Sequence, residues 1–283
     1  MKPFKNVGTA LALSPNLEAN ICESIRIRDQ MGEYLYFIHV DQGMEREKEQ
    51  IEEALERVGC NMDKVEVLWK EGDPVDAILS AAEHYSLDLL VAGAKSREGL
   101  LQYYKGSIAR KLVRKSKSSI LLMISPQKFA HRCHHIVVNG LDHPKTRTTI
   151  AKTMELAPNV EAGQISVIEE VASTKEYQRA DDDAKLKQVI DRRKKRTQEE
   201  ERMESLLNTI QIPKGLSVQH RAIIGKQGYT IGHYAQSVQA DLLVLNSPDT
   251  KLGFIDRVFT HDLEHILNEL PCDTLIIHST AEA

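Results

Sequence analysis

The sequence predicts an α/β fold made of two tandem doubly wound domains, each a five-stranded parallel sheet (strand order 3-2-1-4-5) flanked by helices. Three observations predict it. Short apolar runs alternate with amphipathic stretches, which is typical of parallel strands joined by crossover helices. This succession occurs twice along the 283 residues. A chain of this length also suits two domains of ordinary size.

The first half contains five apolar runs with helical patterns between them. The predicted strands are Val7–Leu13, Tyr34–Val40, Val65–Trp69, Leu87–Gly93 and Ser119–Ile124. The predicted helices, in which apolar residues recur with the helical period, are Leu17–Met31, Glu45–Val58, Pro74–Tyr85 and Ser107–Ser116.

The second half repeats this order. Its predicted strands are His135–Gly140, Gln164–Ile168, Ser217–Ile224, Asp241–Asn246 and Thr274–His278. The turn at Gly72, the helix after it and the strand after Asp88 recur in the second half at Gly225 and Asp241, with a constant difference in residue number. We expect both aspartates to mark the point where the fourth strand of each half begins. The polar stretch around Pro126 lacks periodicity. We therefore expect domains at residues 1–126 and 127–283.

One charged segment, at about residues 175–205, breaks the symmetry of the two halves. Its charges run acidic at 181–183, basic at 192–196 and acidic again at 199–201. Such alternation favours a solvated helix with ion pairs between successive turns. The alternative functional hypotheses are a docking helix for a partner protein and an RNA-binding patch, and the flanking acids weigh against RNA.

Composition narrows the class of protein. The net charge of -4, from 37 basic and 41 acidic residues, argues against a dedicated nucleic-acid binder. Four cysteines without a CxxC pair, and no signal-peptide pattern, predict free thiols in a cytoplasmic protein. No apolar run approaches the roughly 20 residues of a membrane span, so we expect no membrane partner.

A glycine-punctuated loop follows the fourth predicted strand. It begins at Gly93 and ends at Gly106-Ser107, where a helix is predicted to open. Backbone N–H groups in such a loop, together with the positive end of a helix dipole, can cradle a phosphate group. Lys95 and Arg97 add positive charge there.

The pattern Gly93-x2-Ser96-x9-Gly106-Ser107, with Arg97 and Gly99, resembles the nucleotide-binding loop of the universal stress protein family, and the resemblance extends over both halves. It implies a protein that supports stress tolerance and binds ATP or a related nucleotide, with Mg²⁺ as its only metal, and that is not an enzyme beyond weak ATP hydrolysis. The implied contacts are Leu11 and Val40 beside the base, and Gly93, Lys95, Ser96, Arg97, Gly99, Gly106 and Ser107 around phosphate.

The match is incomplete in both halves. Ala12 stands where nucleotide-binding members end the first strand with Asp, and Ser96 replaces the second loop glycine. In the second half the loop is Asn246-x2-Asp249-x9-Phe259-Thr260, and Asn139 is expected at the position of the first-strand Asp. Asp249 would repel phosphate, so nucleotide is expected in the first domain only. The alternative is a scaffold or partner-binding stress protein with both pockets degenerate.

The remaining motifs predict structure rather than chemistry. The apolar fifth strands lie at sheet edges, which invite pairing. In the universal stress protein family, separate single-domain chains dimerise through the fifth strand, so the resemblance implies that the two halves pair as an internal pseudo-dimer. A further homodimer is left open. Two histidine clusters, at residues 131–135 and at His261 and His265, are interpreted as solvated rather than metal-binding, because too few ligands converge.

Overall fold

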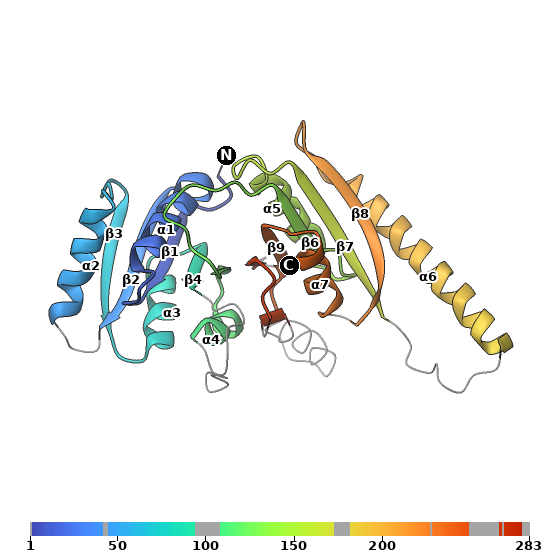
Figure 1. Ribbon diagram of the computed structural model, residues 1–283, viewed down its shortest axis with the longest axis horizontal. Coiled ribbons are helices and arrows are strands. Elements are labelled where there is room, and N and C mark those ends of the chain that lie inside the picture. Colours follow the sequence, from blue (N-terminus) through green and yellow to red (C-terminus); the bar gives the residue numbers. More distant parts are fainter. Residues whose placement is uncertain are drawn as a thin grey trace.

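The computed structural model shows one continuous ten-stranded sheet with helices on both faces (Figure 1). It describes residues 2–41, 45–93, 108–172, 182–226, 228–248, 266–267 and 269–278. Of the elements predicted from the sequence, the α/β class and the mostly parallel sheet are confirmed.

The first half follows the predicted succession of strands and helices. Its elements are β1 (Asn6–Leu11), α1 (Leu17–Met31), β2 (Tyr34–Asp41), α2 (Glu45–Arg57), β3 (Val65–Glu71), α3 (Pro74–His84), β4 (Leu89–Gly93), α4 (Ile108–Lys115) and β5 (Ser119–Met123). The start of α3 shows how local chemistry sets a boundary. The Asp73 carboxylate accepts hydrogen bonds from the backbone N–H groups of Val75 and Asp76, at 3.0 and 3.1 Å, and proline fixes the first helical position.

The second half repeats the succession. Its elements are β6 (His135–Asn139), α5 (Thr146–Leu156), β7 (Gln164–Ala172), α6 (Asp182–Leu207), β8 (Ser217–Gly225), α7 (Thr230–Ser237), β9 (Leu242–Asn246) and β10 (Asp273–Ile277). Most of the charged segment forms α6, which stands between the second and third strands of its half, as α2 does in the first. It has 26 residues, against 13 in α2.

The strand order is β3-β2-β1-β4-β5-β10-β9-β6-β7-β8. Each half therefore has the predicted order 3-2-1-4-5, and its strands are parallel. The two fifth strands pair antiparallel, with Leu121 opposite Leu275. The halves thus meet at their fifth strands, and β3 and β8 lie at the two ends of the sheet.

Apolar side chains form a core on each face of the sheet. Ile21, Ile51, Ile150 and Met203 belong to one buried cluster, so α1, α2, α5 and α6 cover that face. The opposite cluster contains Ile78, Leu112 and Ile231, from α3, α4 and α7. Crossover helices divided between two faces are the arrangement of a doubly wound sheet.

Two equivalent aspartates tie the first and fourth strands of each half together. Asp88 Oδ2 accepts hydrogen bonds from the backbone N–H groups of Lys5 and Asn6, at 2.8 and 3.0 Å. Asp241 Oδ2 accepts the same pair of bonds from His134 and His135, at 2.7 and 2.9 Å. Both aspartates mark strand entry as predicted, and they fix how residues of the two halves correspond.

Candidate functional site

The candidate site lies at the carboxyl ends of β2, β1 and β4. In a doubly wound sheet, ligands bind where the strand order reverses, which here is between β1 and β4. Leu11 pairs with His39, and Ala10 pairs with Ala92, so the ends of the three strands lie side by side. Leu11, Val40 and Gly93, the described members of the predicted site, therefore lie at one edge of the sheet. The side chain of Leu11 packs in the cluster on the α1 face, and that of Val40 packs against the cluster on the α3 face.

Among the described residues, none contacts the side of Gly93 where another residue would carry a side chain. A Cβ atom added to Gly93 would meet no atom of the described residues within 4 Å. The other predicted phosphate contacts, Lys95, Ser96, Arg97, Gly99, Gly106 and Ser107, lie outside the described residues.

His39 is a site residue that the sequence analysis did not single out. It is 4% exposed, and its Nδ1 and Nε2 atoms lie 3.1 Å from the Leu11 carbonyl oxygen and from Glu47 Oε2. The ring also packs edge-on against Trp69. His39 therefore holds the end of β1 and joins it to α2. A histidine within the apolar run of β2 was the signal that could have identified it.

The register of the two halves corrects one assignment made from the sequence. Asn139 was expected to be the counterpart of Ala12. It lies four residues after His135, which makes it the counterpart of Ala10, because Asn6 and His135 receive the same aspartate bond. The counterpart of Ala12 is Leu141. The same register sets Glu169 at the position of His39 and Glu170 at the position of Val40.

In the second half, α6 covers the equivalent edge of the sheet. Arg202 Nη2 donates to the Gly140 carbonyl oxygen at 2.8 Å and to Glu169, and its Nε donates to Glu199 at 2.8 Å. A Cβ atom on Gly140 would lie 2.5 Å from the Met203 Cε atom. Two side chains of α6 therefore fill the end of β6.

Glu170 fills the neighbouring position with a buried carboxylate. It is 4% exposed, and its two oxygens accept hydrogen bonds from Gly228 N at 2.9 Å and Ile231 N at 2.8 Å. These amides lie at the beginning of α7, where a negative charge interacts favourably with the helix dipole. Lys226 stands at the position of the capping Asp73, so a glutamate from β7 supplies the cap that the local sequence lacks.

Lys145 ties down the residues that follow β9. Its Nζ donates to the carbonyl oxygens of Ser247 and Pro248, at 3.2 and 3.1 Å, and to the Ser247 hydroxyl at 3.2 Å. Asn246, the counterpart of Gly93, donates from Nδ2 to Thr146 Oγ1 at 2.9 Å. Side chains therefore occupy the second crevice, by which we mean the edge of the sheet at the carboxyl ends of β6, β7 and β9 that corresponds to the candidate site of the first half.

Burial perturbs two ionisable groups in this half. Burial raises the pKa of Glu169 to about 7, although the Arg202 guanidinium opposes the shift. Burial, and next the positive charge of Lys145, lower the pKa of His278 to about 4. Burial therefore favours the neutral form of each group more than water does.

Glu169 predicts a pH-dependent stability. Its pKa in the fold exceeds the ordinary value of 4.5, so its stabilising contribution is present below about pH 4.5 and is lost as the pH rises through about 7. Glu169→Gln mimics the neutral acid. Between pH 4.5 and 8 we expect the wild type to lose about 2 kcal/mol of unfolding free energy relative to this variant. Urea unfolding of both proteins across this range measures the difference, and parallel pH profiles would refute the assignment.

The other clusters named from the sequence show structural contacts. His135 Nε2 lies 2.8 Å from the Ser166 hydroxyl, and His131 Nδ1 lies 2.6 Å from Arg26 Nη1. Within the described ranges, no group of three or more His, Cys, Asp or Glu side chains is arranged to hold a metal ion. His261 and His265 lie outside those ranges. In the same part of the chain, no helix is long and apolar enough to cross a bilayer.

Comparison with known proteins gives a family match for the first half. Residues 9–123, which run from β1 to the end of β5, match the model of the universal stress protein family. No curated protein matches the sequence.

Solved structures resemble the chain over nearly its full length. A putative universal stress protein from Pseudomonas aeruginosa UCBPP-PA14 has a TM-score of 0.67 and 15% identity, with 97% of this chain and 93% of that chain covered. A universal stress protein from Archaeoglobus fulgidus DSM 4304 has a TM-score of 0.65 and 13% identity, covering 98% and 96%. The cytoplasmic domain of a prokaryotic cation chloride cotransporter has a TM-score of 0.53 and 12% identity, covering 100% and 98%. At these identities the likeness concerns the fold alone.

Proposed function

The chain belongs to the universal stress protein family through residues 9–123, and from this premise we propose that its first half binds ATP or a related nucleotide while its second half does not. The observation that carries the proposal is the contrast between the two crevices. At Gly93 of the first, no atom of the described residues lies within 4 Å of an added Cβ, whereas the second is filled by Arg202, Met203 and Glu170.

The proposed site has a base side and a phosphate side. The ends of β1 and β2, at Leu11 and Val40, would lie beside the base, with His39 holding the Leu11 carbonyl in place. Phosphate would meet Gly93, Lys95, Ser96, Arg97, Gly99, Gly106 and Ser107, where backbone donors and two cations suit an anion. Mg²⁺ would enter with the nucleotide, bound mainly by phosphate oxygens and water.

We assign this site to a ligand-binding module rather than to an enzyme. The module would support stress tolerance in the cytoplasm, where the four free cysteines suit a reducing compartment. The domain boundary remains the one expected from the sequence, with residues 1–126 forming the nucleotide-binding domain and residues 127–283 the domain that carries α6.

Titration with a fluorescent ATP analogue in the presence of Mg²⁺ tests the proposal. We expect saturable binding by the wild type, loss of binding with Gly106→Val, and at least about tenfold weaker binding with Lys95→Ala. Lys117→Ala is a matched control, because Lys117 is an exposed lysine paired with Glu83 beyond the far end of α4.

Absence of saturable binding by the wild type at millimolar ATP would refute the proposal. It would favour the alternative, a partner-binding scaffold with two degenerate crevices. Two features favour this alternative: Ala12 stands in place of the aspartate that ends the first strand in nucleotide-binding members, and Ser96 stands in place of the second loop glycine.

A further inference from the structure

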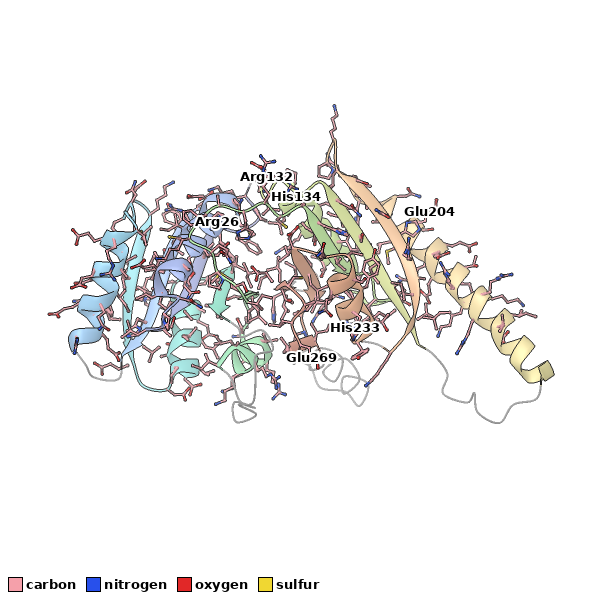
Figure 2. All side chains as sticks on the ribbon, in the orientation of Figure 1. Arg26, Arg132, His134, Glu204, His233 and Glu269 are labelled. Carbon is pink, nitrogen blue, oxygen red and sulfur yellow. The ribbon has the colours of Figure 1, made fainter. Side chains whose placement is uncertain are left out.

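His39 joins the end of β1 to α2 at the edge of the sheet that carries the proposed nucleotide site. Its ring lies on the face covered by α1 and α2, because Leu35 and Phe37 of the same strand pack in that cluster. Figure 1 shows α2 beside β3 at one end of the molecule, and Figure 2 shows side chains extending from this helix toward the sheet. With 4% of its surface exposed, His39 acts on the site through the groups that it contacts.

Both ring nitrogens of His39 face hydrogen-bond acceptors. The Nδ1 atom lies 3.1 Å from the Leu11 carbonyl oxygen, and the Nε2 atom lies 3.1 Å from Glu47 Oε2. A carbonyl oxygen and an ionised carboxylate only accept, so each contact requires a hydrogen on the ring, and an imidazole carries two N–H groups only when it is protonated. The geometry therefore fits a His39 imidazolium paired with the Glu47 carboxylate. The alternative, a proton on Glu47, keeps the same proton between the same two atoms.

Three elements pack against the His39 ring. From β1 it meets the Leu11 carbonyl, and from β3 it meets the indole of Trp69, whose centroid lies 5.8 Å away in an edge-on arrangement. From α2 come Glu47, whose side chain is 20% exposed, and Lys48, whose ammonium lies 5.6 Å from the centroid of the Trp69 ring. The acid in contact with the imidazole is therefore Glu47.

Loss of the shared proton breaks one of the two contacts. A neutral imidazole has a single N–H group. If the hydrogen stays on Nδ1, the bond to Leu11 survives and a lone pair of Nε2 faces the Glu47 carboxylate. If it stays on Nε2, the bond to Glu47 survives and a lone pair of Nδ1 faces the Leu11 carbonyl. In either case the link from β1 to α2 is interrupted, and the pair changes from neutral to negative.

We propose that the His39–Glu47 pair is a proton-linked clamp that positions the end of β1, so that nucleotide binds more tightly while the pair holds its proton. This inference rests on the proposed function of the first half. The protonated pair fixes the Leu11 carbonyl beside the base, whereas the deprotonated pair adds a negative charge that repels phosphate. The two forms therefore differ in affinity for nucleotide, which is what links binding to the proton. His39 and Glu47 are positioning residues.

Titration of the full chain with ATP and Mg²⁺ at about pH 6 and about pH 9 tests the proposal. We expect the dissociation constant of the wild type to rise at least about tenfold between the two. Glu47→Gln supplies an amide that can accept from Nε2 or donate to it, so both contacts survive loss of the proton and most of the pH dependence should disappear. Glu53→Gln is the matched control and should keep the wild-type pH dependence, because Glu53 is an exposed carboxylate of the same helix that pairs with Arg57. Ionisation of ATP itself acts on all three proteins alike.

The fluorescence of Trp69 gives a readout that needs no nucleotide. Trp69 is the single tryptophan of the chain, and an imidazolium in contact with an indole quenches its emission more than a neutral imidazole does. Emission should therefore rise over the pH range in which the wild type loses affinity for ATP. His39→Asn should show no such transition, which assigns the signal to this ring.

Three results would overturn the inference and leave the proposed function standing. One is a wild-type affinity for ATP that is the same at both pH values. Another is a pH dependence that survives in Glu47→Gln, and the third is a fluorescence transition that survives in His39→Asn. Absence of ATP binding at both pH values would instead refute the proposed function, and this inference with it.

Discussion

Replacing Val40 with glutamate is expected to abolish nucleotide binding by the first half, with the dissociation constant raised at least about a hundredfold. Val40 and Glu170 occupy equivalent positions in β2 and β7. In the second half the Glu170 carboxylate is buried and accepts hydrogen bonds from two backbone amides at the start of α7. In the first half α3 already has its cap from Asp73, so the introduced charge would remain in the crevice. A negative charge there repels phosphate and must lose water when the base binds.

Two neutral substitutions separate charge from size. Val40→Gln adds similar bulk without charge and should weaken binding less than Val40→Glu. Val40→Leu keeps the strand end apolar and should change binding little. Isothermal titration with ATP measures all three variants. Wild-type affinity in Val40→Glu would place the nucleotide away from the end of β2 and contradict the proposed site.

Removing the carboxylate of Glu170 is expected to destabilise the second half by about 3 kcal/mol in Glu170→Ala. The substitution leaves the amides of Gly228 and Ile231 without their present acceptors, at a helix start where Lys226 supplies no local cap. Glu170→Gln retains one acceptor and should cost less. Urea unfolding gives the free energies, and hydrogen exchange should show early opening at the first turn of α7.

The matched comparison for this variant is Asp73→Ala, which removes the local cap of α3. That cap is exposed to more solvent and follows the ordinary N-cap pattern, so about 1 kcal/mol is expected. If Glu170→Ala cost no more than Asp73→Ala, the buried carboxylate would not be the main support of α7.

The two halves therefore use one topology in different ways. In the first, His39 of β2 pairs with Glu47 of α2, and the strand end beside it stays apolar. In the second, Glu169 at the same register pairs with Arg202 of α6, so the carboxyl group and the basic side chain exchange places between strand and helix. The same contact that holds α6 on the sheet also fills the crevice. A longer helix whose side chains occupy the crevice shows how the same fold accommodates different contents at this edge of the sheet.

Much of the fold could be predicted from the sequence because its signals are local. The apolar runs predicted the strands to within a few residues, and the repeated Asp88 and Asp241 predicted where the fourth strands begin. The pairing of the fifth strands was predicted from their apolar composition together with the resemblance to the universal stress protein family. The strand boundaries depend mainly on the local order of residues along the chain.

The contents of the second crevice could not be predicted in this way. Glu170 sits in a predominantly apolar strand, and its partners are 58 and 61 residues away. Arg202 lies in the charged segment, for which the sequence predicted a solvated helix. The last turns of that helix instead bury Met203 over Gly140. The misplacement of Asn139 has the same origin, because only the strand register shows which residues share a position.

The number of nucleotides bound per chain tests the central claim most directly. Native mass spectrometry of the full chain, titrated with ATP and Mg²⁺, should show a single nucleotide per chain in the wild type and none in Val40→Glu. Two nucleotides per chain would contradict the closed second crevice, and a single nucleotide that persists in Val40→Glu would contradict the assignment to the first.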